Sequence, residues 1–258
     1  MNDERRPEAI ARDIRNEILR GLYRPGERLP SERELAEQVG VNRGSAREAL
    51  KLLAQQRLIE IQPGGSRVIP VHRASLDVLA HLLDAPGGPD AALMAQLLDV
   101  HELLLVGAVR LAVERGSDAE LARALGILDA MADPRSGGDA YLRNMQALIE
   151  WIAEASHNLV LRMVGNGLLG VLARVVVALR RQRPAHAELA PAVAAVRKAL
   201  AKRDADAAER SIRSLLRLKR EHVLKQLEAS AAAAVATPRR PRAARGSRES
   251  STRTGDAN

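Results

Sequence analysis

Apolar residues near the start of the chain recur at helical spacing. Ile10, Ile14 and Ile18 stand four residues apart, and Gly21 follows them as a helix stop. Because residues three or four apart share one face of an α-helix, the pattern predicts an amphipathic helix over residues 7–20. The turn-rich segment RPGERLP comes next, so a tight turn follows this helix.

Two further helices are predicted after that turn. Ser31 and Glu34 form a capping-box pattern, and the helix that they start ends at Gly40, a residue suited to a left-handed C-terminal position. Asn42 is a second N-cap, and it begins a helix over residues 43–57 whose alanines and leucines face inward. The short turn between these helices has the length found in a helix-turn-helix.

A β-hairpin is predicted directly after the third helix. The runs LIEIQ and SRVIP are short and β-like, and they flank Pro63, Gly64 and Gly65. Three helices followed by such a hairpin make a winged helix-turn-helix, which we assign to residues 5–73.

The start of the helix over residues 43–57 carries the chemistry of this unit. In a helix-turn-helix the second helix of the pair places its N-terminal residues on base edges in the major groove. Arg43 and Arg47 offer bidentate donors to guanine, Gly44 and Ser45 allow close backbone approach, and free amides suit phosphate. The alternative is a solvated face on an ordinary helix. The order of caps, turn, basic start and wing favours a DNA interface.

The remaining apolar pattern is helical throughout, so the fold class is mostly α. Residues 74–228 are predicted to form an all-helical bundle domain, and no β-run or glycine-rich phosphate loop interrupts them. Loops such as DAPGGPD and DPRSGGD separate the expected helices. The predicted helices cover residues 75–84, 90–115, 117–132, 139–156, 158–182, 187–202 and 204–229.

Residues 159–179 are apolar enough to raise the question of a membrane span. Arg162, Asn166 and Arg174 lie inside this run, so the central helix of a bundle explains it better, and no membrane partner is expected. The N-terminal residues MNDERRPEAI have no apolar signal core, and a cytoplasmic location is therefore expected.

Charge is concentrated at the two ends of the chain. The net charge of +8 divides into +3 for residues 1–73, +1 for residues 74–228 and +4 for residues 229–258. Nucleic acid is the natural partner of the basic ends. Residues 229–258 lack apolar periodicity and are predicted to be a disordered basic tail, with either a nonspecific attraction to DNA or only a solubilising role. With no cysteine, a thiolate metal site or a cysteine nucleophile is excluded.

The segment from RPGERLP to SRVIP resembles the DNA-binding module of the GntR transcriptional regulators, and the match covers about residues 8–70. The resemblance implies sequence-specific binding to double-stranded DNA. By position it implies roles at the DNA for Arg33, Asn42, Arg43, Gly44, Ser45 and Arg47, and for Gly64 and Gly65 at the wing.

The helical domain resembles the FadR-type subgroup of that family, whose bundle binds an effector. The likeness rests on LLDVHELLLVGAVRLAVERGSDAEL, on LIEWIAEASHNLVL with its Ser156 and Asn158, and on the turn and helix around Asp204. A fused aminotransferase-like domain, found in another subgroup, needs a far longer chain. The resemblance implies a small-molecule effector and a homodimer on a palindromic operator.

Many bundles of this subgroup hold a metal through one Asp and three His. Counting from Asn158 and Asp204 puts those ligand positions at Met145, Ile149, Val193 and Leu215, which are all apolar. We therefore expect no metal and no cofactor. Four aliphatic residues indicate either a dry pocket for an effector with an apolar body or a filled core with no cavity.

The predicted effector contacts lie on two helices. The subgroup usually has Arg and Glu where His101 and Leu105 stand in this chain. Four residues recur at four-residue steps along the apolar helix, namely Arg162, Asn166, Gly170 and Arg174. They either line a cavity and bind the acidic end of an effector, or face solvent or a dimer interface. We assign effector binding to His101, Arg162, Asn166 and Arg174.

These patterns predict a ligand-responsive, homodimeric transcriptional regulator that binds a palindromic operator. The effector is expected to be a small organic acid, and a hydrophobic acid fits the four aliphatic positions better than a hydroxy acid or sugar acid. An enzyme is the rival hypothesis, but no nucleophile–base spacing supports catalytic residues. The other alternative is a nucleoid-type protein without effector control, which would show little sequence preference.

Overall fold

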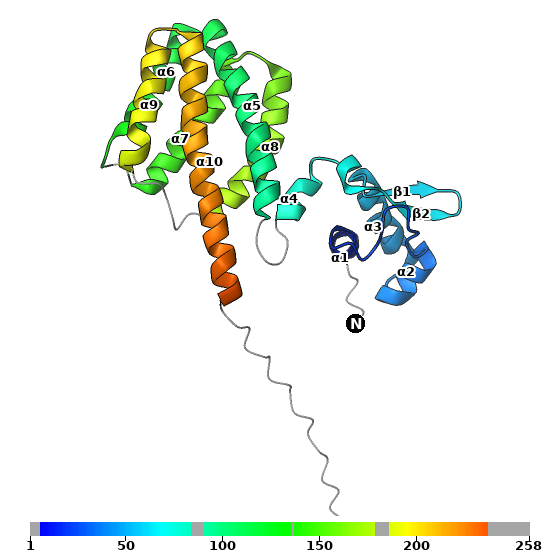
Figure 1. The fold of residues 1–258 in the computed structure, drawn as a ribbon. Coiled ribbons are helices and arrows are strands. Elements are labelled where there is room, and N and C mark those ends of the chain that lie inside the picture. The colour runs from blue at the N-terminus through cyan, green and yellow to red at the C-terminus, as the bar shows by residue number, and fades with distance from the viewer. Residues whose placement is uncertain (1–5, 84–89, 136, 179–185, 237–258) are drawn as a thin grey trace, which may run out of the picture.

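The computed structural model describes residues 6–83, 90–135, 137–178 and 186–236. The chain forms a small N-terminal body that contains a two-stranded sheet and a larger body built only of helices (Figure 1). The mostly helical fold class predicted from the sequence is confirmed.

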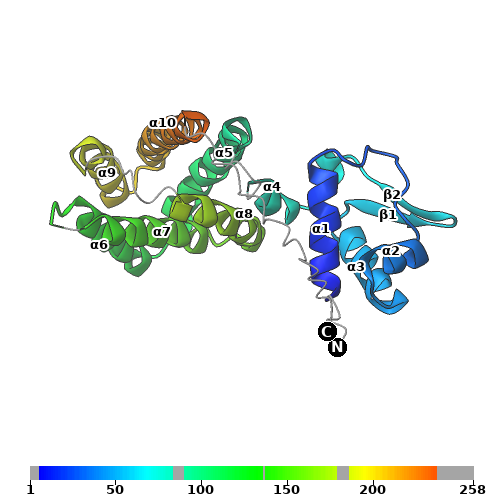
Figure 2. The ribbon, with the colours of Figure 1, turned by 90° about the horizontal axis from the view of Figure 1, so that it is seen from below.

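The N-terminal body is a winged helix-turn-helix, as predicted. Its elements are α1 (Pro7–Leu19), α2 (Glu32–Val39), α3 (Arg43–Gln55), β1 (Ile59–Gln62) and β2 (Gly65–Val68). Helices α1 and α2 both pack on α3, and the strands pair antiparallel from Ile59 opposite Val68 to Gln62 opposite Gly65. Figure 2 shows the hairpin projecting beyond α3.

The turn between α1 and α2 supports the wing, a contact that the sequence pattern does not predict. Residues 24–29 run beside β2: the amide of Gly26 donates to the carbonyl of Val68 at 2.8 Å, and the amide of Leu29 donates to that of Ser66 at 2.9 Å. The backbones of Arg28 and Arg67 form an isolated antiparallel β-bridge. The hairpin therefore has a third, irregular strand along one edge, which gives β2 partners on both sides.

Aliphatic side chains hold this body together. Ala46, Ala49 and Leu53 of α3 have no exposed surface, because α1 and α2 cover that face. We call this cluster the winged-domain core; its buried members are Ile10, Ala11, Ile14, Ile18, Leu29, Leu35, Ala36, Ala46, Ala49, Leu50, Leu53, Leu58, Ile59, Val68 and Val78.

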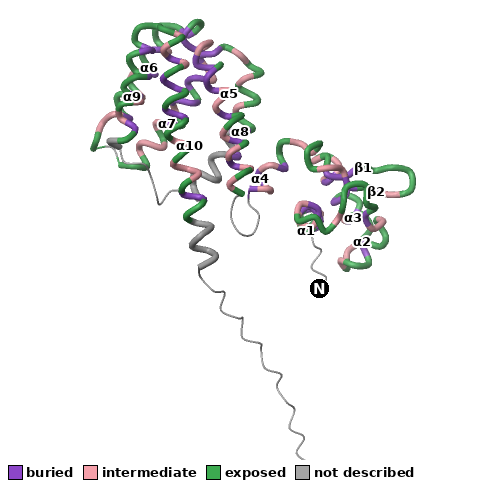
Figure 3. Tube along the Cα trace, viewed as in Figure 1, coloured by how far each residue is buried: buried purple, intermediate pink, exposed green. Residues whose placement is uncertain are grey.

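The larger body contains the seven helices that the sequence pattern predicts. After a 3-10 turn, η1 (Val71–Arg73), they are α4 (Val78–Leu83), α5 (Ala91–Arg115), α6 (Asp118–Ala132), α7 (Gly138–Ala155), α8 (Leu159–Ala178), α9 (His186–Ala201) and α10 (Ala205–Ala236). Helix α10 packs against α5 and α9, while α6 packs against α7 and α9. Buried positions line the inward faces of these helices (Figure 3).

Two clusters fill the bundle. The main bundle core contains Leu128 and Trp151, neither of which has exposed surface, together with Met145, Ile149, Val193 and Leu215. A second cluster, the junction core, lies where α4 meets the bundle; it consists of Ala80, Leu83, Met94, Leu97, Leu168, Val171 and Leu227.

Helix α4 belongs to both bodies. Its Val78 is 1% exposed and packs in the winged-domain core, while Ala80 and Leu83 pack in the junction core. The predicted boundary between residues 73 and 74 stays a prediction. A fragment that keeps the whole winged-domain core must nevertheless include Val78.

The predicted disorder of residues 229–258 is wrong at its start. Helix α10 continues through residues 229–236, eight residues past the predicted end of the bundle. Alanine is the strongest helix former, so this alanine-rich segment extends α10 without needing an apolar face. Residues 237–258 lie outside the described residues.

Among the described residues, helix α5 has the length and hydropathy of a membrane span, and Leu159–Leu168 is a shorter apolar segment. Helix α5 contributes nine buried residues to the bundle. Its packing against α7 and α10 accounts for its apolar composition as that of a core helix.

Candidate functional site

The N-terminal end of α3 has the geometry expected of a recognition helix. The side chain of Asn42 accepts a hydrogen bond from the amide of Ser45 at 2.8 Å, which confirms it as the N-cap. A Cβ atom on Gly44 would lie 3.1 Å from Oδ1 of Asn42, so glycine keeps this cap uncrowded. The exposed end of the helix therefore presents free amides and the positive end of the helix dipole.

Arg43 and Arg47 are both exposed beside this capped end. Neither makes an ion pair within the described part of the chain, whereas the neighbouring Glu48 pairs with Lys51 at 2.9 Å. Arg33, on α2, is also exposed, and its contact with Glu37 spans 3.9 Å between two exposed side chains. A pair of this kind contributes little, so all three guanidinium groups are available to an anionic partner.

The wing tip is made of two glycines in left-handed conformations. Gly64 has φ +100° and Gly65 has φ +125°. A Cβ atom at Gly64 would meet nothing within 4 Å, but one at Gly65 would lie 2.7 Å from Nε of Arg28. Gly65 thus leaves space for the side chain of Arg28, whose backbone forms a β-bridge with β2.

Replacing Gly65 with alanine should destabilise the wing by about 1–3 kcal/mol, because it adds a close contact to a strained backbone. Gly64→Ala is the matched control, since it carries only the backbone strain. Thermal unfolding and operator affinity of both variants measure the difference. Equal losses in the two variants would show that the contact with Arg28 has no effect.

The four positions where other members of the subgroup have metal ligands all pack in one cluster. Met145, Ile149, Val193 and Leu215 are between 1% and 9% exposed, and all belong to the main bundle core. Across the described segments, no group of three or more His, Cys, Asp or Glu residues has the geometry of a metal site. Aliphatic side chains therefore occupy the place where the resemblance would put ligands.

The signature residues Ser156, Asn158 and Asp204 cap helices. The buried hydroxyl of Ser156 donates to the carbonyl of Ala153 at 2.7 Å and accepts from the amide of Asn158 at 3.3 Å. Asn158 in turn accepts from the amide of Leu161 at the start of α8. Asp204 does the same for Ala207 in α10, at 2.9 Å. These residues specify helix junctions.

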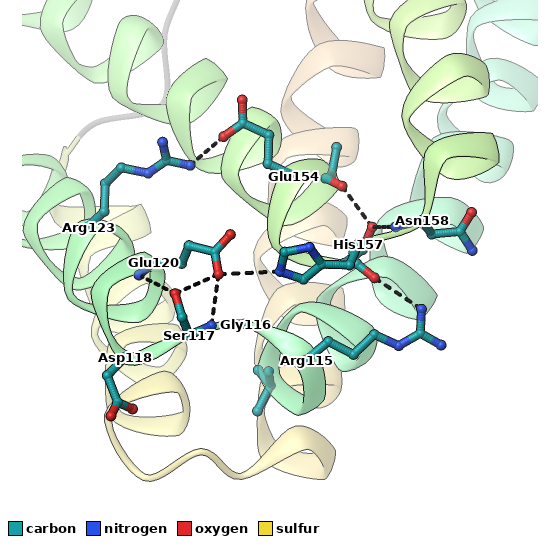
Figure 4. A network of polar contacts seen from close by, with 12 residues as sticks. Arg115, Gly116, Ser117, Asp118, Glu120, Arg123, Glu154, His157 and Asn158 are labelled. Atoms are coloured by element: carbon teal, nitrogen blue, oxygen red, sulfur yellow. Dashed lines mark hydrogen bonds and ion pairs between the residues drawn. The ribbon is translucent and has the colours of Figure 1, made fainter.

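The junction after α7 is also tied to its neighbours (Figure 4). Arg115, at the end of α5, donates to the carbonyl of Ser156 at 3.1 Å. His157 has φ +47° and lies 3.4 Å from Glu120, the capping-box residue of α6. Hydrogen bonds from Ser117, together with the contact with His157, lower the pKa of Glu120. The ends of α5, α6, α7 and α8 are thus fixed together.

The predicted effector residues divide between the interior and the surface. His101 is buried, at 9% exposed, whereas Arg162 and Asn166 on α8 are exposed. The side chain of Arg174 lies outside the described residues. The placement of Arg162 and Asn166 agrees with the solvent or dimer-interface alternative for this stripe, and their role in effector binding stays a prediction.

Sequence reasoning missed two polar residues of the bundle. Lys219 on α10 is close enough to His101 for its charge to lower the pKa of that imidazole, after the larger effect of burial. Tyr141 on α7 has a buried hydroxyl with no hydrogen-bond partner among the described residues. Their helical positions gave no signal, because a lysine or tyrosine within an amphipathic helix usually lies at the edge of the apolar face with its polar end in water.

The fold and the α3 surface define a winged helix-turn-helix protein with an all-helical second domain. Residues 7–69 match the bacterial regulatory proteins of the gntR family, and residues 96–218 match the FCD domain. The chain belongs to the GntR family and carries an FCD domain. Proteins of this family are DNA-binding transcriptional regulators with a ligand-binding FCD domain, not enzymes.

Named relatives agree with this assignment. The chain is 37% identical to the HTH-type transcriptional regulator Mce2R of Mycobacterium tuberculosis over 134 residues, which are 50% of this chain and 55% of that protein. It is 30% identical to the regulator LutR of Bacillus subtilis over 155 residues, which are 60% of this chain and 70% of LutR. The chain thus spans little more than half the length of the mycobacterial relative.

One solved structure supports the fold. The Lar structure from Listeria monocytogenes has a TM-score of 0.52 and 15% sequence identity, and the similarity covers 89% of this chain and 99% of that one. At this level of identity the likeness concerns architecture alone.

Proposed function

We propose that this chain is a cytoplasmic, ligand-responsive transcriptional regulator that binds a palindromic operator as a homodimer. The observation that carries the proposal is the start of α3, where a capped helix end presents two exposed arginines that form no ion pair with any described residue. Gly44 and the glycines of the wing tip have structural reasons of their own, but none of those reasons requires two exposed arginines at the start of α3. Contact with the base edges and phosphates of DNA accounts for these arginines.

The helical domain supports the dimer. The first turns of α8 leave Leu159, Val160 and Met163 between 66% and 70% exposed. These positions share one face of the helix. A monomer seldom leaves several large apolar side chains of one face in water, which favours a second copy of this chain as the occupant. Two winged modules would then meet two operator half-sites.

The effector is proposed to be a small organic acid. One named relative, the fatty acid metabolism regulator protein of Klebsiella pneumoniae, is 28% identical over 160 residues, which are 61% of this chain and 65% of that protein. The aliphatic main bundle core favours a ligand with an apolar body over a sugar acid.

Arg47→Ala tests the groove assignment. An operator is first selected from random duplexes with the full chain. The variant should then bind it more weakly by about 1–3 kcal/mol and discriminate less at one base pair, because a bidentate contact to guanine is lost. Fluorescence anisotropy on the selected operator and on single-base variants measures both effects.

Arg12→Ala is the matched control, since it removes the same charge from an exposed position on α1. Its effect should be small and equal for all sequences. Unchanged affinity and preference in Arg47→Ala would refute the groove assignment. A full chain that does not distinguish the selected palindrome from random DNA would favour the nucleoid-type alternative.

A further inference from the structure

Helix α10 approaches its end beside the helix that enters the winged domain. Leu227, near the end of α10, packs in the junction core together with Ala80 and Leu83 of α4. Helix α4 also reaches the winged-domain core through Val78, which lies only about 8 Å along the helix from Leu83. The last part of α10 is therefore held next to the connection to the DNA-binding body.

Helix α10 then continues past this junction. Residues 228–236 are still helical, which adds about 14 Å to the helix beyond Leu227. Figure 1 shows this end of α10 extending beyond α4 and the rest of the bundle, to the level of the winged domain. The chain therefore leaves the bundle at the end where the DNA-binding body is attached, and not at the opposite end, where α9 meets α10.

Residues 237–258 lie outside the described residues, but their composition indicates one chemistry. They contain no Leu, Ile, Val, Met or aromatic residue, so they cannot add to a core. Residues 239–248, which we call the arginine segment, contain five arginines and no acidic residue. These arginines are Arg239, Arg240, Arg242, Arg245 and Arg248. Their guanidinium groups therefore determine what this segment binds.

The rest of the chain is not acidic. The winged domain and the bundle both have a net positive charge. On the face where α5 meets α10, Asp99 already pairs with Arg220. Glu102 on the same face lies 3.8 Å from both Arg213 and Arg217. An external polyanion therefore matches five arginines better than the surface of this chain does.

The arginine segment has the length and charge density to follow a DNA backbone. An extended chain covers about 3.3 Å per residue, so residues 239–248 span about 33 Å, close to one turn of the duplex. Duplex DNA presents one negative charge for about every 1.7 Å of its axis. The residues after Ala236 span at most about 75 Å, or roughly two turns of DNA. Phosphates beyond the half-site that α3 and the wing cover are within this reach.

We propose that the arginine segment binds the phosphate backbone of the DNA that flanks the operator half-site held by the winged domain. Helix α10 brings the segment there, because its end is fixed in the junction core beside α4. The contact does not depend on base sequence, since guanidinium groups bind phosphate oxygens through charge and hydrogen bonds. It lengthens the DNA footprint and adds an affinity that salt weakens. The proposal rests on the proposed function, in which the winged domain occupies an operator.

The experiment compares the full chain with a glutamine variant, in which all five arginines of the segment are replaced. The substitutions are Arg239→Gln, Arg240→Gln, Arg242→Gln, Arg245→Gln and Arg248→Gln. One duplex is the selected operator cut at the outer ends of its half-sites, and the other has about ten further base pairs, one turn of DNA, on each side. Fluorescence anisotropy over a series of salt concentrations gives the affinity of each protein for each duplex.

The full chain should bind the longer duplex about tenfold to a hundredfold more tightly than the short one at about 0.1 M salt, whereas the glutamine variant should bind both equally. Each phosphate contact contributes about 0.9 to the slope of log affinity against log salt concentration. On the longer duplex the glutamine variant should therefore have a slope smaller by about 1 to 2, the loss of one or two contacts. On the short duplex the two proteins should have the same affinity.

The matched control replaces the same five arginines with lysine, which keeps the charge. Phosphate contacts made through charge tolerate this change, so the lysine variant should keep the gain on the longer duplex. All three proteins should have the same Tm, because no residue of the three cores lies beyond Leu227. A lysine variant that loses the gain would contradict a contact made through charge.

Equal binding of the two duplexes by the full chain overturns the proposal and leaves the segment with only a solubilising role. Tighter operator binding by the glutamine variant also overturns it, because the segment would then occupy the winged domain itself. Preference for the operator over a random duplex of the same length depends on α3, so it should be the same in all three proteins. A full chain without that preference refutes the proposed regulator, whereas a salt slope that is equal in the full chain and the glutamine variant refutes the segment contact.

Discussion

Residues 1–83 alone are expected to bind the selected operator about 10²- to 10⁴-fold more weakly than the full chain. The fragment keeps the winged-domain core, including Val78, and its α3 surface is unchanged. It loses the bundle that we propose to join two modules. When two binding modules are linked, the second contact forms at a high effective concentration, and that gain is lost in a single module.

The comparison needs proof that the fragment is folded. Circular dichroism with a cooperative thermal transition provides it, and light scattering gives the number of chains in each sample. The control DNA is a single half-site, to which one module of the full chain can bind. Fragment and full chain should bind this half-site with similar affinity. Equal affinities on the whole palindrome would contradict the dimer and its role in DNA binding.

Leu128→Ala should destabilise the helical domain by about 2–5 kcal/mol. Leu128 has no exposed surface and lies in the main bundle core, so its loss removes buried apolar area and leaves a cavity. The chain has one tryptophan, Trp151, which is fully buried in the same core. Its fluorescence therefore reports unfolding of the helical domain without a signal from the winged domain.

Leu103→Ala is the control for this measurement. Leu103 lies on α5 and is 72% exposed, so the same truncation removes little buried area. Its effect on the free energy of unfolding should stay within about 0.5 kcal/mol. Urea titration followed by fluorescence gives both values. Equal destabilisation in the two variants would mean that Leu103 is covered in the assembled protein or that the core tolerates the cavity at Leu128.

The helices of the winged domain were predictable from sequence because local interactions determine where they begin and end. Ser31 and Asn42 start their helices through side-chain caps, and Gly40 ends one at φ +74°. A cap needs only residues three or four positions apart, so the sequence itself contains the whole interaction. The pairing of residues 24–29 with β2 was not predictable, because it joins segments about forty residues apart, mainly through backbone atoms, with the guanidinium of Arg67 donating to the carbonyl of Gly26.

The candidate effector site was less predictable for a related reason. A four-residue repeat such as Arg162 and Asn166 identifies a helix face but does not say which neighbour that face meets. The structure leaves both residues exposed and brings Lys219 near His101, although they lie 118 positions apart in sequence (101 to 219). Burial of single polar groups depends on helix packing, which no local pattern records.

The six-residue helix α4 determines how the two bodies are oriented. At 1.5 Å per residue it is about 9 Å long, and Val78 and Leu83 anchor it in different cores. It therefore packs in both bodies at once. Each residue of an α-helix turns the chain by about 100°, so one inserted residue would rotate Leu83 out of the junction core or Val78 out of the winged-domain core. In the dimer that we propose, the helical phase of α4 would set the distance between the two half-sites, so changes in the length of α4 should alter the spacing of the operator.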